Sequence, residues 1–289
     1  MTARGGHSMR VERFHDRDAF AARVEPFLLE HEAENCFFLG QIAHLRDVGD
    51  KVLVAATDDS ENVAAVATMT PPRHMVITRG PGEAIAAIVD YFIDHRIEVP
   101  GIGGRRASAE TFAQRWTAAT GIAGHLHVEM RTFQLTTVIP PPPAPGKMRL
   151  VEESDLDLLT RWVQEFRKEI GEQLSVDDSR EVAEQRIRDR QMVFWEIDGT
   201  PVATAGAIGP TRNGIRIVLV YTPPEHRGRG YASNLVAALS QQQLDAGRKY
   251  CFLNTDQANP TSNKIYTALG YRPVCESIQI MFDRPGDAR

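Results

Sequence analysis

The decisive stretch of the sequence reads Val220-Tyr221-Thr222-Pro223-Pro224-Glu225-His226-Arg227-Gly228-Arg229-Gly230-Tyr231-Ala232-Ser233. It joins residues 215–221, which are rich in strand formers, to residues 232–246, whose apolar side chains repeat at helical spacing. A turn that enters a helix leaves backbone N–H groups without acceptors at the positive end of the helix dipole. Gly228 and Gly230 let a bulky anion approach this backbone, and the two arginines add positive charge. The stretch therefore predicts a strand, a phosphate-binding loop and a helix, without the Walker or GxGxxG pattern of nucleotide sites.

The sequence around this stretch predicts a mixed α/β sheet layered with helices. Leu156, Leu159, Val163, Phe166 and Ile170 are spaced by three and four residues, which predicts an amphipathic helix that starts near Ser154 or Asp155. The other expected elements are a helix over 180–190, strands over 192–197, 202–207 and 215–221, a helix over 232–246, a strand over 250–254, a helix over 260–269 and a strand over 277–282.

A proline-rich segment, residues 140–146, suits a semi-rigid spacer because prolines favour an extended backbone. Sequence similarity between the two halves supports a boundary there. Residues 9–11 resemble residues 148–150, and several further positions match at the same shift of 139 residues. We therefore expect a duplicated chain with a first domain over 1–139, a linker over 140–146 and a second domain over 147–289.

Two motifs of the second half resemble those of the GNAT superfamily of acyltransferases. The first is Arg227-x-x-Gly230-x-Ala232, which follows an apolar strand and a proline. The second is the segment 259–271, in which an asparagine precedes a tyrosine by seven residues and a glycine and an aromatic residue follow. The resemblance covers about residues 150–283. It implies an α/β fold of two tandem GNAT-like domains, each a mixed, mostly antiparallel sheet flanked by helices.

The resemblance also implies roles for individual residues. The amides of 228–233 would bind the pyrophosphate of acetyl-CoA, the backbone of 220–222 would pair with the pantetheine arm, and Tyr266 would protonate the leaving thiolate. The alternative for Tyr266 is a core residue whose hydroxyl bonds to backbone. The expected cofactor-binding residues are Val220, Tyr221, Thr222, Arg227, Gly228, Arg229, Gly230, Tyr231, Ala232, Ser233 and Asn259, where Asn259 would orient the cofactor or the helix.

The general base cannot be placed by the same resemblance. Members of the family often carry a glutamate on or near the strand that precedes the loop, but residues 215–221 contain no carboxylate. Glu196, Glu165, Glu169 or an ordered water are the alternatives for accepting the proton of the amine.

The first half contains a weaker copy of the loop, Arg79-Gly80-Pro81-Gly82-Glu83-Ala84. Pro81 has no N–H to donate, Glu83 would repel a phosphate, and Trp116 stands where the second half has Tyr266. The sequence therefore predicts a degenerate, non-catalytic first domain that lines the acceptor cleft.

The composition narrows the class of protein. The formal net charge of −5 offers no basic field for a nucleic acid, and no apolar run has the length of a spanning helix. The three cysteines lack CxxC spacing and have apolar neighbours, so we expect buried thiols and no metal site. We expect a cytoplasmic N-acetyltransferase that acts on a primary amine of a small-molecule acceptor, without a nucleic-acid or membrane partner. Alternatives are a non-catalytic acyl-CoA sensor and an acetyltransferase of protein lysines or N-termini.

Overall fold

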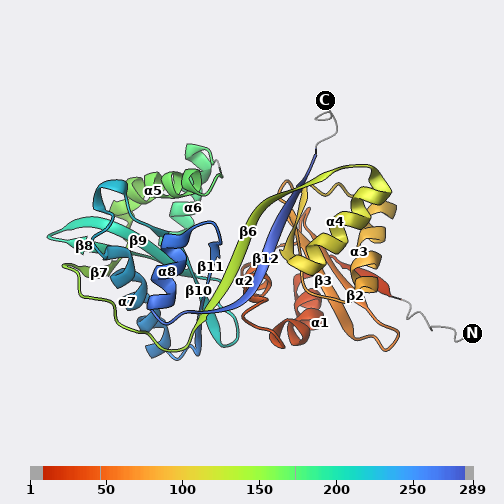
Figure 1. The fold of residues 1–289 in the computed structure, drawn as a ribbon, viewed down its shortest axis with the longest axis horizontal. Coiled ribbons are helices and arrows are strands. Elements are labelled where there is room, and N and C mark those ends of the chain that lie inside the picture. Colours follow the sequence, from red (N-terminus) through yellow and green to blue (C-terminus); the bar gives the residue numbers. More distant parts are fainter. Residues whose placement is uncertain (1–8, 46, 173, 284–289) are drawn as a thin grey trace, which may run out of the picture. The chain divides into compact units, whose positions relative to one another are not determined.

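The computed structural model describes residues 9–45, 47–172 and 174–283, which form two compact units. Unit 1 comprises residues up to 132 together with 255–258 and 274–283. Unit 2 comprises residues 133–254 and 259–273. Figure 1 shows that each unit contains a sheet with helices packed on it.

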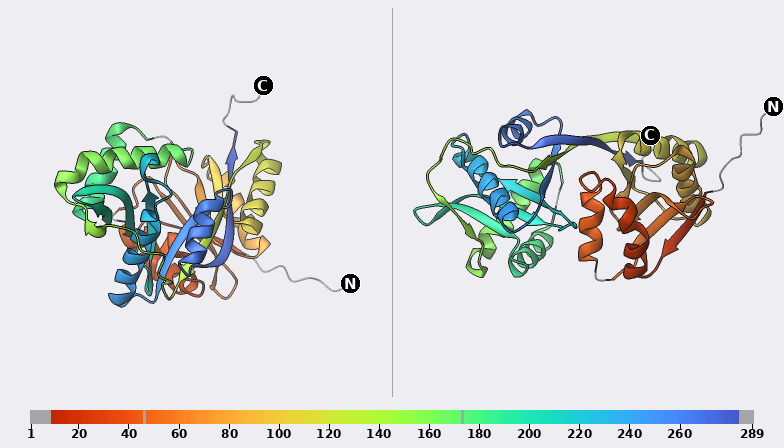
Figure 2. Two further views of the ribbon diagram at one scale, coloured as in Figure 1. Left: turned by 60° about the vertical axis from the view of Figure 1, so that its left-hand side comes forward. Right: turned by 90° about the horizontal axis from the view of Figure 1, so that it is seen from below.

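Unit 1 is built on a sheet with the strand order β1-β2-β3-β4-β5-β12-β6. Its strands are β1 (Arg10–Phe14), β2 (Val52–Thr57), β3 (Val63–Met69), β4 (Met75–Ile77), β5 (Gly101–Arg105), β12 (Arg272–Phe282) and β6 (Gly124–Leu135). Its helices are α1 (Arg17–Leu29), α2 (Cys36–His44), α3 (Gly82–Asp94) and α4 (Arg106–Thr120). Alternate residues of β2 pack with α3 and α4 on one face and with α1 and α2 on the other, as the period of a strand requires. Figure 2 shows helices on both faces of this sheet.

Unit 2 has the strand order β6-β11-β10-β9-β8-β7. Its own strands are β7 (Lys147–Leu150), β8 (Met192–Ile197), β9 (Thr200–Ile208), β10 (Gly214–Tyr221) and β11 (Tyr250–Asp256). Its helices are α5 (Leu156–Glu169), α6 (Val176–Arg188), α7 (Tyr231–Asp245) and α8 (Pro260–Ala268). One core cluster joins the sheet to α7 and α8, and another joins it to α5 and α6.

The predicted elements of the second half occur within a few residues of their expected bounds. Helix α5 starts at Leu156 after a short 3₁₀ turn at Glu153–Asp155, in which Glu152 and Asp155 form a capping box. In both units, antiparallel strands lead to a parallel strand–helix–strand crossover, which is β4-α3-β5 in unit 1 and β10-α7-β11 in unit 2. The same order of elements therefore occurs twice, in agreement with two tandem GNAT-like domains.

The proline segment 140–146 lies within unit 2, whereas the sequence predicts a spacer between folded units there. The indole nitrogen Nε1 of Trp195 donates to the carbonyl of Pro145 at 2.8 Å, and Nδ2 of Asn234 donates to that of Pro142 at 3.0 Å. Because prolines keep their carbonyls as acceptors, neighbouring side chains can fix such a segment against the sheet and α7.

The last strand also departs from the expected division of the chain. Residues 274–282 of β12 belong to unit 1, where they pair antiparallel with β5 from Ser277 opposite Arg105 to Met281 opposite Gly101. Ile278 and Phe282 pack in the core formed with α3 and α4. The first half of the sequence therefore does not contain all strands of the sheet of unit 1. Figures 1 and 2 show that β12 lies beside β6.

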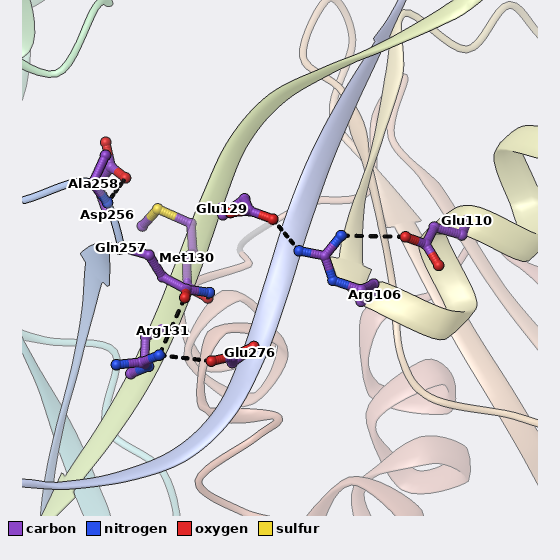
Figure 3. Close-up of polar contacts among 9 residues, drawn as sticks. All are labelled: Arg106, Glu110, Glu129, Met130, Arg131, Asp256, Gln257, Ala258 and Glu276. Atoms are coloured by element: carbon purple, nitrogen blue, oxygen red, sulfur yellow. Dashed lines mark hydrogen bonds and ion pairs between the residues drawn. The ribbon is translucent and has the colours of Figure 1, made fainter.

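Residues 255–258 join unit 1 through polar contacts with β6 (Figure 3). The backbone N–H of Gln257 donates to the carbonyl of Glu129 at 2.8 Å, and Nη2 of Arg131 donates to Oε1 of Gln257 at 3.1 Å. The same Arg131 nitrogen lies 2.7 Å from a carboxylate oxygen of Glu276 on β12. These contacts fix the turn that leads into α8.

Candidate cofactor and active site

The candidate site of unit 2 lies where the pairing of β10 with β11 ends. The parallel ladder between β10 and β11 ends at the pair Arg216 and Phe252. Beyond it, β10 pairs with β9 through a bulge between Val218 and Tyr221 that adds one residue to β10, and Leu219 takes the left-handed region with φ of 52°. The backbone of 219–222 therefore has an edge without a partner strand among the described residues, which an extended chain could join.

The loop of Arg227–Ser233, here called the cofactor loop, follows this edge and leads into α7. Gly228 and Gly230 have φ of 75° and 79°, a conformation that side-chain-bearing residues rarely adopt. A Cβ atom built on Gly228 would meet nothing within 4 Å, so the space above the loop is open. Helix α7 has no side-chain cap, and its 15 residues place a positive dipole end at Tyr231, Ala232 and Ser233.

The residues present fit an acyl-CoA. The loop offers uncapped amides to a pyrophosphate, Arg229 is exposed and forms no ion pair among the described residues, and the ring of Tyr231 is buried so that only its backbone faces the loop. In addition, Oγ1 of Thr222 is buried without a hydrogen-bond partner in the described part of the chain. An orphaned hydroxyl next to an unpaired strand edge is consistent with a polar ligand at that edge.

Arg227 does not project toward the open side of the loop as a free charge. Its Nη2 contacts the carboxylate of Glu169 on α5, and its Nε donates to the carbonyl of Thr222 at 2.8 Å. Its guanidinium also lies 5.9 Å from the ring centroid of Tyr221. The sequence could not indicate these contacts, because Glu169 lies 58 residues away along the chain.

Tyr221 and Val220 face different surroundings. The hydroxyl of Tyr221 donates to Oε2 of Glu165 at 2.9 Å, and the side chain is 3% exposed. Burial, and then the hydrogen bond to Glu165, raises the pKa of Tyr221 above its usual value, so this phenol stays protonated at neutral pH. Val220 is partly buried in the core under α7.

Tyr266 lies on α8, which begins after Asn259. The side chain of Asn259 accepts from the backbone N–H of Ser262 at 3.0 Å, so it caps the helix, which is one of the two expected roles. The Tyr266 ring is 8% exposed and lies 5.9 Å from the ring of Tyr271. Its hydroxyl forms no hydrogen bond with another described residue, and burial raises its pKa above the ordinary value. Tyr266 and Tyr231 belong to the same core cluster of unit 2.

The three glutamates considered as the base each contact another side chain. Glu196 pairs with Arg149, Glu169 pairs with Arg227, and Glu165 accepts from Tyr221. A pocket of about 350 Å³ adjoins the start of the cofactor loop. Its walls include Trp162, Glu165, Pro201, Pro223 and His226.

The corresponding place in unit 1 has a different geometry. All three residues of β4 pair with β5, from Met75 opposite Ile102 to Ile77 opposite Gly104, and no bulge interrupts β4. Helix α3 follows Pro81, which has no N–H, and Arg79 contacts His31. Trp116 is buried. The bulge that interrupts β10 in unit 2 therefore has no counterpart in β4.

Comparison with known proteins assigns the class. Residues 156–271 match the model of the acetyltransferase (GNAT) family, so this segment, which contains the bulge, the cofactor loop and Tyr266, is a GNAT acetyltransferase domain. The matched residues lie in the second half of the chain, and acyl transfer from CoA is the activity of this family. A comparison with curated protein sequences finds no match.

The chain as a whole has the fold of solved GNAT proteins of similar length. A GCN5-related N-acetyltransferase from Sphaerobacter thermophilus superposes with a TM-score of 0.66 at 17% identity, with 96% of each chain covered. A GNAT-family acetyltransferase from Colwellia psychrerythraea gives 0.61 at 11% identity, with 95% of this chain and 100% of that chain covered. A tandem GNAT protein from the clavulanic acid biosynthesis pathway gives 0.61 at 12% identity, with 97% and 100% covered. The fold is therefore that of two GNAT-like domains in tandem.

Membrane-spanning helices and metal clusters are both absent from the described part of the chain. Across residues 9–45, 47–172 and 174–283, no helix combines the length and apolarity needed to cross a membrane. Within the same ranges, no three His, Cys, Asp or Glu side chains gather as a metal site.

Proposed function

We propose that unit 2 transfers an acetyl group from acetyl-CoA to a primary amine of a small-molecule acceptor by direct attack. The observation that carries this proposal is the open edge of β10 at residues 219–222, directly followed by an uncapped helix N-terminus. A strand edge suits the amide-bearing pantetheine arm, and a helix N-terminus suits a pyrophosphate. Together they match the two chemically distinct parts of one CoA molecule.

The reaction exchanges a C–S bond for a C–N bond. Acetyl-CoA supplies the acyl group as a thioester. A backbone N–H on the open edge of β10 donates to the thioester carbonyl, where negative charge grows as the amine attacks. Tyr266 donates its proton to the departing thiolate and is reprotonated by solvent, and the amine loses a proton to solvent as the amide forms. The chain places no carboxylate on β10 for that last proton, so we assign no side chain as the base.

The acceptor is proposed as a small amine, without a nucleic-acid or membrane partner. The pocket of about 350 Å³ beside the cofactor loop has the volume of a small-ligand site. We propose that unit 1, in which no bulge interrupts β4 and Pro81 precedes α3, has no catalytic role of its own.

One observation favours a second candidate, a non-catalytic acyl-CoA sensor. Glu165, Glu169 and Glu196 are each held by another side chain, which leaves no uncommitted carboxylate among the bases considered. Release of free CoA thiol over a panel of amines separates the two functions. Amine-dependent release supports transfer, and slow hydrolysis that no amine accelerates supports the sensor.

The test of the cofactor site is a calorimetric titration of acetyl-CoA into the wild type and the Gly230→Asp variant. An aspartate there places a side chain and negative charge where the pyrophosphate is proposed to bind, so the Kd should rise at least roughly tenfold. Gly199→Asp is the matched control, because Gly199 also has positive φ (82°) and open space around its Cβ position. Absence of binding to the wild type would refute the proposed function, and equal loss in both variants would argue against a site at this loop.

A further inference from the structure

Helix α5 presents two carboxylates, one helical turn apart, to the segment that leads from β10 into the cofactor loop. Glu165 accepts from the hydroxyl of Tyr221 at 2.9 Å, and Glu169 contacts Nη2 of Arg227. Residues four apart share one face of a helix, so both contacts come from the same side of α5. Tyr221 and Arg227 are the two ends of a seven-residue segment.

The segment between these ends has little freedom of its own. Pro223 and Pro224 fix two φ angles, and the N–H of His226 donates to the carbonyl of Pro223 at 2.9 Å in a short 3₁₀ turn. Arg227 closes the segment on itself, because its Nε donates to the carbonyl of Thr222 at 2.8 Å. A segment that is rigid and tied at both ends transmits the position of α5 to the next part of the chain.

The cofactor loop begins at the last residue of this segment. Its uncapped amides start one residue after Arg227, and a set of amides binds an anion well only when the donors are already aligned before binding. The Glu169 carboxylate offsets the charge of Arg227, so the guanidinium gains a fixed position and adds little to the field at the loop.

We propose that Glu169 and Arg227 are positioning residues: their ion pair ties α5 to the cofactor loop and holds the pyrophosphate-binding amides in place. The inference rests on the proposed function, since it assigns the loop to a pyrophosphate. A simpler assignment is that Arg227 attracts the phosphate directly, and the two assignments predict opposite changes in acetyl-CoA affinity when the Glu169 charge is removed. In that assignment, removal of the Glu169 charge would free Arg227 and tighten binding, whereas a positioning pair predicts weaker binding.

The test compares Glu169→Gln with Glu184→Gln. Glu184 is the matched control because its ion pair with Arg180 on α6 has side chains 45% and 46% exposed, against 44% and 46% for Glu169 and Arg227. We expect the Kd for acetyl-CoA to rise roughly three- to tenfold in Glu169→Gln and to stay unchanged in Glu184→Gln. Binding of acetyl-pantetheine, which lacks the pyrophosphate, should be the same in both variants.

Arg227→Lys provides a second measurement. It keeps the positive charge but loses the planar guanidinium that reaches the Thr222 carbonyl and Glu169 together, so we expect a weakening similar to that of Glu169→Gln. Tighter or unchanged acetyl-CoA binding in Glu169→Gln, or an equal loss for acetyl-pantetheine, would overturn the inference. Failure of the wild type to bind acetyl-CoA would instead overturn the proposed function.

Discussion

At the scale of single residues, Tyr266 combines two properties that a proton donor to a thiolate needs. Its ring is fixed in the core under α8, and its hydroxyl has no hydrogen-bond partner among the described residues. The burial of the ring also suits the alternative of a core tyrosine, so a measurement of turnover must separate the two roles. A donor kept free of other partners can turn to the substrate without first breaking a bond.

The first prediction at this scale concerns Tyr266→Phe. Loss of the proton donor should lower kcat roughly a hundredfold while the Kd of acetyl-CoA stays unchanged. Burial raises the pKa of Tyr266, so in the wild type this group should remain protonated and cause no loss of kcat up to about pH 10. Steady-state rates at saturating acceptor over pH 6–10, with calorimetry for binding, test both points. Near-normal turnover of the variant would remove Tyr266 from the reaction.

The second prediction concerns Arg149, which binds Asp155 at 2.6 Å and also contacts Glu196. Both carboxylates have side chains 13% exposed, so Arg149→Met leaves two partly buried carboxylates without their ion-pair partner and should lower the free energy of unfolding by about 1–3 kcal/mol. The hydrogen bond from Arg149 is the largest cause that lowers the pKa of Asp155 in the folded chain. The contribution of the Arg149–Asp155 pair to stability is therefore fully present above the unfolded pKa of about 3.9. It is lost as the pH falls from there through the lower pKa of Asp155 in the folded chain.

Urea unfolding of the wild type and Asp155→Asn at pH 7, 5 and 3.5 measures this contribution. The difference in stability between the two proteins should be largest at pH 7 and should shrink at pH 3.5, because Asp155 then binds a proton more readily in the unfolded chain than in the folded one. Asp157→Asn is the control, because Asp157 is 88% exposed and pairs with Arg180 at the surface. A constant difference across this range would show that the Asp155 charge is not what stabilises the capping turn.

At the scale of elements, β10 and α7 together decide the site. The apolar run of 215–221 and the helical period of 232–246 predict both elements, and the two glycines indicate the turn between them. The bulge and the end of the β10–β11 ladder could not be predicted, because a bulge depends on which residues of β9 and β11 lie opposite. The bulge is nevertheless the feature that opens the edge on which the proposed function depends.

The partners of the cofactor loop belong to this scale as well. Sequence motifs place Arg227 in the loop, and a positive side chain next to a phosphate-binding turn suggests direct attraction. The fold instead brings α5 across β10, so Arg227 and Tyr221 contact Glu169 and Glu165. For α5 we therefore predict that Glu169→Gln binds acetyl-CoA more weakly than Glu184→Gln does.

At the scale of the whole molecule, the chain's last strand completes the sheet of unit 1. This arrangement makes the N-terminal residues dependent on the C-terminal ones for their core. We therefore expect that Ile278→Ala in β12, where the side chain is 1% exposed, destabilises N-terminal elements of unit 1 that lie far from it in the sequence. The cavity should lower the stability of unit 1 by about 2–4 kcal/mol.

Hydrogen exchange measured by mass spectrometry locates this effect. Amides of β5 and α4 should exchange faster in Ile278→Ala, although they precede the substitution by more than 150 residues. Leu235→Ala is the control, because Leu235 is fully buried in the core under α7 and its loss should act on unit 2. Faster exchange confined to α7 and α8 in Ile278→Ala would contradict the assignment of β12 to unit 1.

The sequence alone determined the class of fold, the doubled order of elements and the cofactor loop with its glycines. These features depend on local properties, namely side-chain periodicity, the φ angles open to glycine and the dipole of a helix. Only the tertiary structure decided which strand pairs with β5, where the proline segment 140–146 binds, and that Arg227 contacts Glu169. Such contacts join residues far apart in the chain, and the free energy that selects them arises from the packing of complete sheets and cores, which no local pattern contains.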